Sequence, residues 1–377
     1  MFALEALNAR HGDALLLYFG SDADPGLILC DAGPSGTYGR ILRPRLEELK
    51  GERSPDDALP IDLLMVSHLD DDHVHGVVDL LEDLVEKKDN QEALPWAVRK
   101  LWINQFDDIV GNSDDELRQA LGAALGADRT VKGGLPAEPD ALAVAANVPQ
   151  GQSVRDDARR LFIDLNGSPF SGLVSAGAGS VDVDLGRGLV LTVVAPNRRQ
   201  LEDLQRQWDK VIRKKAKKPE EALAEAAEYL DKSVYNLSSI VVLARATDRT
   251  MLLTGDARGD HILTSLESAG LLEDGKLHVD LFKLPHHGSV RNVEPEFFEA
   301  ITADHYVISA NGRDGNPEAE TLRMLSAART DDQFTIYVTN TIPHVEAFFD
   351  KERAEGRRYE VIIRPEESSS IRINLAA

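Results

Sequence analysis

Short apolar runs and amphipathic stretches alternate along most of the chain. The apolar runs predict buried strands at residues 14–19, 27–30, 61–66, 98–103, 181–195, 239–243, 251–253, 279–284, 334–339 and 359–363. Apolar residues at helical spacing predict helices at 41–50, 76–88, 115–126, 138–147, 197–232 and 317–328. Strands interleaved with helices over the whole chain predict an α/β (α+β) fold.

We expect residues 1–377 to form a single domain with two insertions. The first, at about 107–180, carries no recognisable motif, and the second, at about 197–232, is helical and highly charged. The second contains a basic run at 213–218, which is typical of a solvated helix face; phosphate binding is the alternative. Either insertion offers a surface on which a protein partner could dock.

The charge balance limits the class of function. Forty-two Lys and Arg face 64 Asp and Glu, so the formal net charge is −22. This excess argues against non-specific capture of nucleic acid by a basic surface. The negative charge does not exclude an enzyme that binds phosphate groups through divalent cations, because such cations are often the largest local charges in a site.

Other features indicate the compartment. No apolar run approaches the ~20 residues that span a bilayer, and the first residues lack a basic region followed by an apolar one. We therefore expect no membrane anchor and no secretory signal. Cys30 is the only cysteine and cannot pair within the chain, which favours a cytoplasmic location.

The chemistry concentrates in residues 67–76, between a predicted strand and a predicted helix. His68 and Asp70 share a face of extended chain, and Asp72 and His73 follow at the expected start of the helix. Imidazoles and carboxylates together form a mixed nitrogen and oxygen ligand set suited to Zn²⁺ or Mn²⁺. The alternative is a solvated acidic turn, but five of the ten histidines fall here and at 286–287.

Two later strand ends carry the same residue types. The apolar run at 251–253 leads into Asp256, and the run ending at residue 284 leads into His286 and His287. A single Gly-Asp turn is weak evidence for a site. Three strand ends that each deliver metal-ligand types predict one common metal centre.

With these motifs in this order, the sequence resembles the metallo-β-lactamase superfamily, and within it the hydrolase domain of the DNA-uptake protein ComEC and its soluble relatives. The similar segments are LNARHGDA at 7–14, LCDAG at 29–33, HLDDDH at 68–73, NLSSIV at 236–241, TGD at 254–256, KLPHHGS at 283–289 and ISAN at 308–311. The resemblance implies an αββα sandwich with a metal site at one edge, between two sheets.

The resemblance also implies roles for individual residues. One ion would be held by Asp72, His73, Asp256 and one of the pair His286 and His287, with His287 favoured; a second would be held by His68 and Asp70, with Asp256 as a bridge. His286 would then support the site or contact phosphate. Lys283 is implied as a phosphate contact, with a solvent-facing lysine as the alternative, and Asp31 as a support for the site's loops.

The chain departs from the family pattern at three positions. Asp70 stands where the superfamily has a second histidine, Asn197 stands at the third motif, and Asn316 precedes Pro317 where relatives often have His-Pro. Harder oxygen ligands would shift the preference from Zn²⁺ toward Mn²⁺ or Mg²⁺. One or two divalent ions are therefore expected, with the first position weak or oxygen-rich.

These observations predict a metal-dependent hydrolase that cleaves phosphodiester bonds through metal-activated water, with DNA as the expected substrate. The first alternative is a small-molecule phosphodiesterase or lactonase, which the acidic composition favours. The second is a catalytically degraded interaction component of a multi-protein bacterial system, which the missing third-motif histidine favours.

Overall fold

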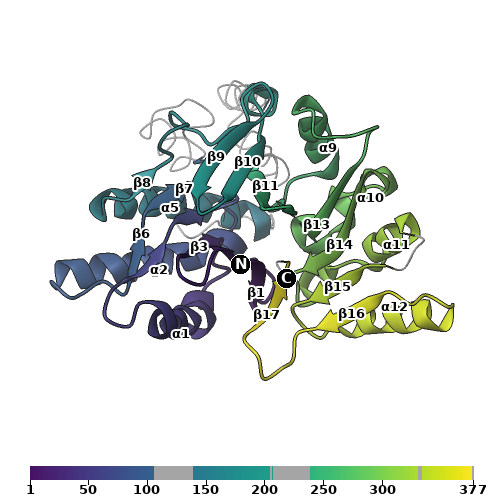
Figure 1. Ribbon diagram of the computed structural model, residues 1–377, viewed down its shortest axis with the longest axis horizontal. Helices are drawn as coiled ribbons and strands as arrows, with labels where there is room; N and C mark the ends of the chain where they lie inside the picture. Colours follow the sequence, from purple (N-terminus) through teal and green to yellow (C-terminus); the bar gives the residue numbers. More distant parts are fainter. Residues whose placement is uncertain (106–138, 204–205, 207–237, 330–332, 376–377) are drawn as a thin grey trace, which may run out of the picture.

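Two β-sheets form the centre of the protein (Figure 1). The computed structural model describes residues 1–105, 139–203, 206, 238–329 and 333–375. The first sheet has the order β17-β1-β2-β3-β5-β7-β8, with bounds β17 Ser370–Asn374, β1 Phe2–Leu7, β2 Leu15–Gly20, β3 Pro25–Cys30, β5 Leu63–Met65, β7 Lys100–Trp102 and β8 Asp164–Leu165. The second has the order β16-β15-β14-β13-β12-β11-β10-β9, with bounds β16 Glu360–Ile363, β15 Thr335–Val338, β14 Ile301–Ile308, β13 Leu277–Lys283, β12 Arg249–Leu253, β11 Val241–Ala246, β10 Leu189–Ala195 and β9 Val181–Gly186. Strands β4 (Leu59–Ile61) and β6 (Trp96–Val98) pair separately.

Helices lie on both sides of this pair of sheets (Figure 1). On the side of the first sheet are α1 (Arg43–Arg53), α2 (Asp71–Asp89) and α5 (Pro139–Arg160). On the side of the second are α9 (Gly259–Ser268), α10 (Pro295–Ala300), α11 (Ala319–Ala328) and α12 (Pro343–Ala354). The short turns are a π-helix at Tyr38–Leu42 and 3₁₀ turns at Pro285–Gly288, Val290–Asn292 and Arg313–Gly315.

The apolar core follows from the alternation of side chains along each strand. Leu16 packs with helices α1 and α2, whereas its neighbour Leu17 packs between the two sheets. Val242 likewise packs between the sheets, and Leu243 packs toward the helices on the far side. Because successive side chains point to opposite faces, strands covered on both faces are apolar almost throughout. This explains the continuous apolar runs, and the mixed α+β class predicted from them is confirmed.

The predicted strand at 61–66 is interrupted, and this is a correction. Two short strands, β4 and β5, flank Asp62. The buried carboxylate of Asp62 accepts a hydrogen bond from the backbone N–H of Leu27 at 3.1 Å and pairs with Arg99 at 2.7 Å. A side chain that must satisfy its charge through these partners breaks the regular strand at that position.

Helix α2 begins five residues earlier than the predicted helix at 76–88. The carbonyl of Asp70 accepts hydrogen bonds from the N–H groups of His73, at 2.9 Å, and Val74, at 3.0 Å. Asp72 and His73 therefore lie in the first helical turn and not on a loop. Carboxylates in that turn also complement the positive end of the helix dipole.

Part of each predicted insertion falls outside the described residues. The helix predicted at 115–126 and the basic run at 213–218 are among the residues not described. Within the first predicted insertion, however, β8 pairs with β7 in parallel, so this part extends the first sheet.

The parallel part of each sheet directs several strand ends to one edge. Strand β3 pairs in parallel with β5, and β12, β13 and β14 are parallel neighbours. The loops after the carboxyl ends of these strands carry Asp31, His68, Asp256, His287 and Ser309. In open α/β sheets, such strand ends are where ligand sites form.

Among the helices that the structure describes, none combines the length and apolar character needed to cross a membrane.

A buried ion pair on the outer part of the first sheet generates a prediction about acid stability. Glu5 is 2% exposed and pairs with Arg45 at 2.9 Å, while Ser370 and Tyr18 also donate hydrogen bonds to it. Burial alone would favour the neutral acid, but Arg45 and these hydroxyl groups hold the pKa of Glu5 below its usual value.

We expect Glu5→Gln to lower the free energy of unfolding at pH 7 by about 1–3 kcal/mol, because it removes a charged acceptor from several buried donors. The lowered pKa means that the contribution of Glu5 is fully present above its usual pKa of 4.5 and is lost as the pH falls through the folded value. Urea unfolding of the wild type and the variant at pH 7 and at about pH 3.5 measures this. The difference in the free energy of unfolding between the wild type and the variant should be smaller in acid. A difference that does not change with pH would contradict a stabilising role for the ionised Glu5.

Candidate metal centre

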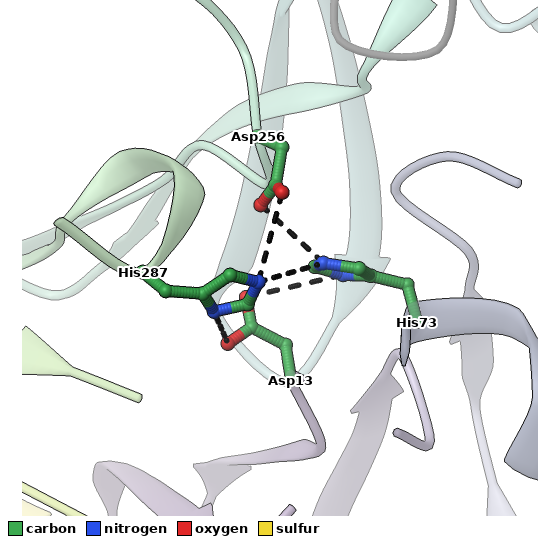
Figure 2. A group of neighbouring side chains, drawn as sticks. All are labelled: Asp13, His73, Asp256 and His287. Atoms are coloured by element: carbon green, nitrogen blue, oxygen red, sulfur yellow. Dashed lines mark hydrogen bonds and ion pairs between the residues drawn. The ribbon is translucent and has the colours of Figure 1, made fainter. Parts of the chain in front are cut away.

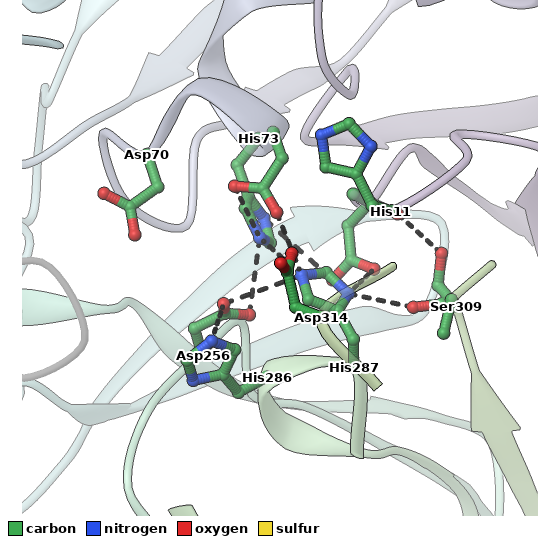
Figure 3. A network of polar contacts seen from close by, with 12 residues as sticks. His11, Asp70, His73, Asp256, His286, His287, Ser309 and Asp314 are labelled. Atoms are coloured by element: carbon green, nitrogen blue, oxygen red, sulfur yellow. Dashed lines mark hydrogen bonds and ion pairs between the residues drawn. The ribbon is translucent and has the colours of Figure 1, made fainter. Parts of the chain in front are cut away.

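Four imidazoles converge on one buried carboxylate. Asp256, 2% exposed, follows strand β12, and the Nε2 atoms of four histidines surround it. The nearest Asp256 oxygen lies 3.3 Å from Nε2 of His73, 3.6 Å from those of His286 and His287, and 3.8 Å from that of His68. The structure thus brings together the three strand ends that the sequence singled out (Figure 3).

The opposite ring nitrogen of each histidine is held by an oxygen atom. Nδ1 of His73 lies 2.8 Å from Asp31 Oδ2, that of His287 2.9 Å from the Ser309 carbonyl, that of His286 2.7 Å from Asn292 Oδ1 and that of His68 3.0 Å from Ser67 Oγ. Carboxylate and carbonyl oxygens only accept hydrogen bonds, so in the first three pairs Nδ1 carries the proton. Ser67 Oγ donates to Asp31, and therefore accepts from His68. When such an imidazole is neutral, its Nε2 atom therefore carries a lone pair that a cation can accept.

Asp31 fixes part of this arrangement from behind. Its carboxylate accepts hydrogen bonds from the backbone N–H of Ser67 at 2.7 Å, from Ser67 Oγ at 2.6 Å and from His73 Nδ1. Metal-bound histidines usually donate their second nitrogen to such a carboxylate. The prediction that Asp31 supports the site's loops is confirmed by these contacts.

The histidine pair after β13 adopts an unusual backbone conformation. His286 has a φ of 45° and His287 a φ of 54°, and Gly288 continues the turn with a φ of 84°. Two consecutive non-glycine residues in the left-handed region are energetically costly, and such strain gathers at functional sites. The turn directs both side chains toward Asp256. His287 is 3% exposed and nested inside, whereas the side chain of His286 is 30% exposed.

Two further carboxylates of the segment 67–76 face these nitrogens. Asp72 Oδ2 lies 3.3 Å from His287 Nε2, and Asp70 Oδ2 lies 3.3 Å from His68 Nε2. Asp71, between them, turns the other way: its Oδ1 lies 2.8 Å from Nδ1 of His75 and accepts a hydrogen bond from Gln150. Asp71 and His75 thus stay outside the centre, as expected of surface residues.

Asp13 lies directly against the centre, and the residue types alone did not single it out. Asp13, His73, Asp256 and His287 each offer one ligand atom within 4.8 Å of the others, and all four are buried (Figure 2). Asp13 lies on the Nδ1 side of the rings, 3.5 Å from His287 Nδ1 and 4.0 Å from that of His73. The Gly-Asp pair at 12–13 is the signal in the sequence that could have identified Asp13.

Gly12 lets this loop approach helix α2. A Cβ atom at Gly12 would lie 1.8 Å from the carbonyl oxygen of Asp72, so no other residue fits without displacing the loop. The backbone N–H of Asp13 donates to that same carbonyl at 3.2 Å. The close approach places Asp13 behind the two imidazoles.

The structure corrects the prediction for Lys283. Its side chain is 1% exposed and its ammonium forms an ion pair with Asp13 Oδ2. The solvent-facing alternative is wrong, because the side chain is buried. The ammonium is also engaged behind the rings and does not lie on the side where Asp72 and Asp256 face them.

The position aligned with the third motif has a structural role. The side chain of Asn197 accepts a hydrogen bond from the backbone N–H of Gln200 and contacts Ser265 on α9 at 3.3 Å. Asn197 therefore contributes no donor to the centre in this structure.

The pKa values of the histidines and carboxyls in the centre are shifted because many charged groups lie close together there. Burial disfavours the charged imidazolium, but Asp256 and Asp13 outweigh it and raise the pKa of His287 to about 10. Asp256, Asp72 and Asp31 raise the pKa of His73 in the same way, against its burial. Burial likewise opposes ionisation of Asp72 and Asp256, yet the histidine charges hold the pKa of both carboxyls well below the usual range. The cluster therefore has a strong affinity for cations.

These residues fit a divalent metal ion. Among the described residues, Oδ1 of Asp256 and Nε2 of His68 are buried polar atoms without a hydrogen-bond partner. Nε2 lone pairs and carboxylate oxygens that face each other repel unless a cation lies among them. Imidazole nitrogen with carboxylate oxygen is a donor set for Zn²⁺ or Mn²⁺.

Comparison with known proteins adds little. No family model matches this chain, and no curated protein matches it. A solved structure described as "Crystal Structure of a Protein of Unknown Function from Enterococcus faecalis V583" is similar over 97% of this chain and 88% of that chain, at 11% sequence identity and a TM-score of 0.29. A likeness at that level carries no argument, so the resemblance to the metallo-β-lactamase superfamily stays a prediction.

We expect the purified protein to bind Mn²⁺ or Zn²⁺ with an affinity that increases as the pH rises. The raised pKa values of His73 and His287 mean that protons occupy these rings in the metal-free protein and must leave when an ion binds. For each proton displaced, the apparent affinity should rise about tenfold per pH unit below the pKa of about 10. Calorimetric titration at several pH values in two buffers measures both the affinity and the protons released.

Asp256→Asn should weaken this binding by at least about 100-fold, because even residues that only support ligands typically contribute 10–100-fold. Asp71→Asn is the matched control, since it removes an equal charge from a carboxylate that faces His75 and Gln150. Equal affinities of the two variants would show that Asp256 is not a ligand.

Proposed function

We propose that the protein is a metal-dependent hydrolase that cleaves phosphodiester bonds, with DNA as its substrate. The observation that carries the proposal is the convergence of the Nε2 atoms of four histidines on the buried carboxylate of Asp256. A purely structural role would not require four buried or half-buried imidazoles to direct Nε2 at a single carboxylate.

The donors divide into two groups around Asp256. His73, His287 and Asp72 would hold one ion together with Asp256, and His68 and Asp70 would hold a second with the same carboxylate. Bound divalent ions there would act as Lewis acids and lower the pKa of a bound water, which is the chemistry that phosphodiester hydrolysis needs. Oxygen-rich coordination around His68 and Asp70 favours Mn²⁺ or Mg²⁺ at that position.

His286 is the histidine best placed to meet a substrate. Its side chain is 30% exposed, and Asn292 fixes the ring through Nδ1 while itself donating to the Asp256 carbonyl at 3.1 Å. Nε2 is thus held in a fixed direction beside Asp256 and can carry a proton to a leaving oxygen. General acids of this kind contribute about 10²–10⁴-fold to rate.

An exposed arginine lies on the His11 side of the centre. Arg313, whose side chain is 62% exposed, lies 2.9 Å from His11 Nε2 through its guanidinium and 3.7 Å from Asp314 Oδ2 through Nε. Burial lowers the pKa of His11. The charge of Asp72 raises this pKa and the charge of Arg313 lowers it, so both groups lie close enough to His11 to interact with it electrostatically. A phosphodiester that approaches this side would reach a guanidinium that also pairs with the exposed carboxylate of Asp314.

We expect the wild type to cleave linear and circular DNA with Mn²⁺, Zn²⁺ or Mg²⁺, and Asp72→Ala to reduce the rate by at least about 100-fold through loss of a ligand. Asp71→Ala is the control, because it removes the neighbouring carboxylate that faces away from the centre. Bis(4-nitrophenyl) phosphate, a small phosphodiester, is assayed in parallel under the same conditions.

The outcomes separate the parts of the proposal. Cleavage of DNA by the wild type and Asp71→Ala but not by Asp72→Ala supports it in full. Cleavage of the small phosphodiester alone removes DNA and leaves a small-molecule phosphodiesterase. No hydrolysis with any of the three metals, in a protein that binds them, overturns the enzymatic proposal and favours an interaction component.

A further inference from the structure

The ion pair between Lys283 and Asp13 lies directly behind the candidate metal centre. Lys283 is the last residue of β13, three positions before His286, and both Lys283 and Asp13 are 1% exposed. Fully buried lysines are rare unless paired, because taking an ammonium group out of water is costly. The cost of burying these two charges therefore raises the question of what the pair does at this place.

Asp13 connects this pair to the rings. Its Oδ1 lies 3.5 Å from Nδ1 of His287, and its Oδ2, which pairs with Lys283, lies 4.0 Å from Nδ1 of His73. Both Nδ1 atoms already have a closer acceptor, Ser309 for His287 and Asp31 for His73. Asp13 is thus not needed to orient the rings through hydrogen bonds, and acts on them chiefly through its charge.

We infer that Lys283 is a positioning residue that cancels the charge of Asp13. The affinity of the centre for a bound cation is then set only by the carboxylates that face the Nε2 atoms of the histidines. The inference rests on the proposed metal centre. In this arrangement, Asp13 supplies a negative charge behind His73 and His287, and Lys283 balances it at the same depth. The pair adjusts the affinity of the centre for a dication without providing a ligand from Lys283.

The two charges act on a dication in opposite directions. Asp13→Asn leaves the Lys283 ammonium buried and unbalanced, and its repulsion should weaken Mn²⁺ or Zn²⁺ binding by about tenfold or more in this low-dielectric interior. Lys283→Met leaves the Asp13 carboxylate unbalanced, which should strengthen binding; an affinity no stronger than that of the wild type counts against the inference. A merely structural pair would instead make both variants bind more weakly, since both would loosen the same packing.

The double variant Asp13→Asn/Lys283→Met provides the decisive measurement. It leaves no buried charge unpaired, so it should fold and recover an affinity within about threefold of the wild type. Mn²⁺ affinities of the four proteins are measured by calorimetry at one pH, with circular dichroism as the test of folding. The visible absorption spectrum of the Co²⁺-substituted proteins then shows whether the ligand set is unchanged.

A second buried ion pair serves as the matched control. Glu5→Gln and Arg45→Met disrupt a pair in which Glu5 is 2% exposed, and whose other partners are Tyr18 and Ser370. Both control variants should lower the free energy of unfolding and leave the Mn²⁺ affinity unchanged.

Opposite shifts in the two single variants, with recovery in the double variant, support the inference. Weaker binding in both single variants, or no recovery in a folded double variant, overturns it. Mn²⁺ binding without hydrolysis of any substrate would overturn the proposed function and leave this comparison intact, whereas a wild type that binds no divalent ion overturns both.

Discussion

A buried carboxylate surrounded by imidazole nitrogens is the constraint on which the rest of this structure depends. Asp256 is 2% exposed and has four Nε2 atoms within 3.3–3.8 Å. Such a group is stable inside a protein only when cations lie close to it, because an isolated buried charge is very costly. Protons on the histidines can supply that charge, and so can metal ions. The competition between them links the stability of the centre to pH and to metal.

The second constraint is that the rings are oriented from outside. Oxygen atoms from Asp31, Ser309, Asn292 and Ser67 occupy the four Nδ1 positions and leave every Nε2 directed inward. These oxygens sit on the loops that follow β3, β14, β13 and β5, so the parallel parts of both sheets hold the rings in place. A site held by rigid elements through such outer contacts keeps its geometry better than one carried by its ligands alone.

Charge is distributed unevenly through the molecule. The chain carries a net charge of −22, and near the centre the ammonium of Lys283 pairs with Asp13 while the guanidinium of Arg313 lies beside His11 and Asp314. The acidic exterior disfavours non-specific attachment to polyanions, so attraction of a phosphodiester to the centre would depend on bound divalent ions. The proposed function therefore depends on local charge and not on the overall balance.

Much of this organisation could be predicted from the sequence, and particular residues show why the rest could not. The α+β class followed from apolar runs, since strands buried on both faces are apolar almost throughout. Asp256, His73, His68 and the pair at 286–287 could be predicted as neighbours, because each follows a strand and carries a ligand type. The start of α2 could not, because it depends on hydrogen bonds to the carbonyl of Asp70.

The chain by itself determined which residue types end the strands, and therefore that a metal centre is expected at one edge of the sheets. Only the tertiary structure decided how those residues are used. It turned Asp72 inward and Asp71 outward, placed Asp13 behind the rings through the close approach of Gly12, and buried Lys283 against it. Apart from the contact of Asp71 with His75, four positions away, these choices depend on contacts between residues about 60 to 270 positions apart. No local pattern in a sequence carries information about such distant partners.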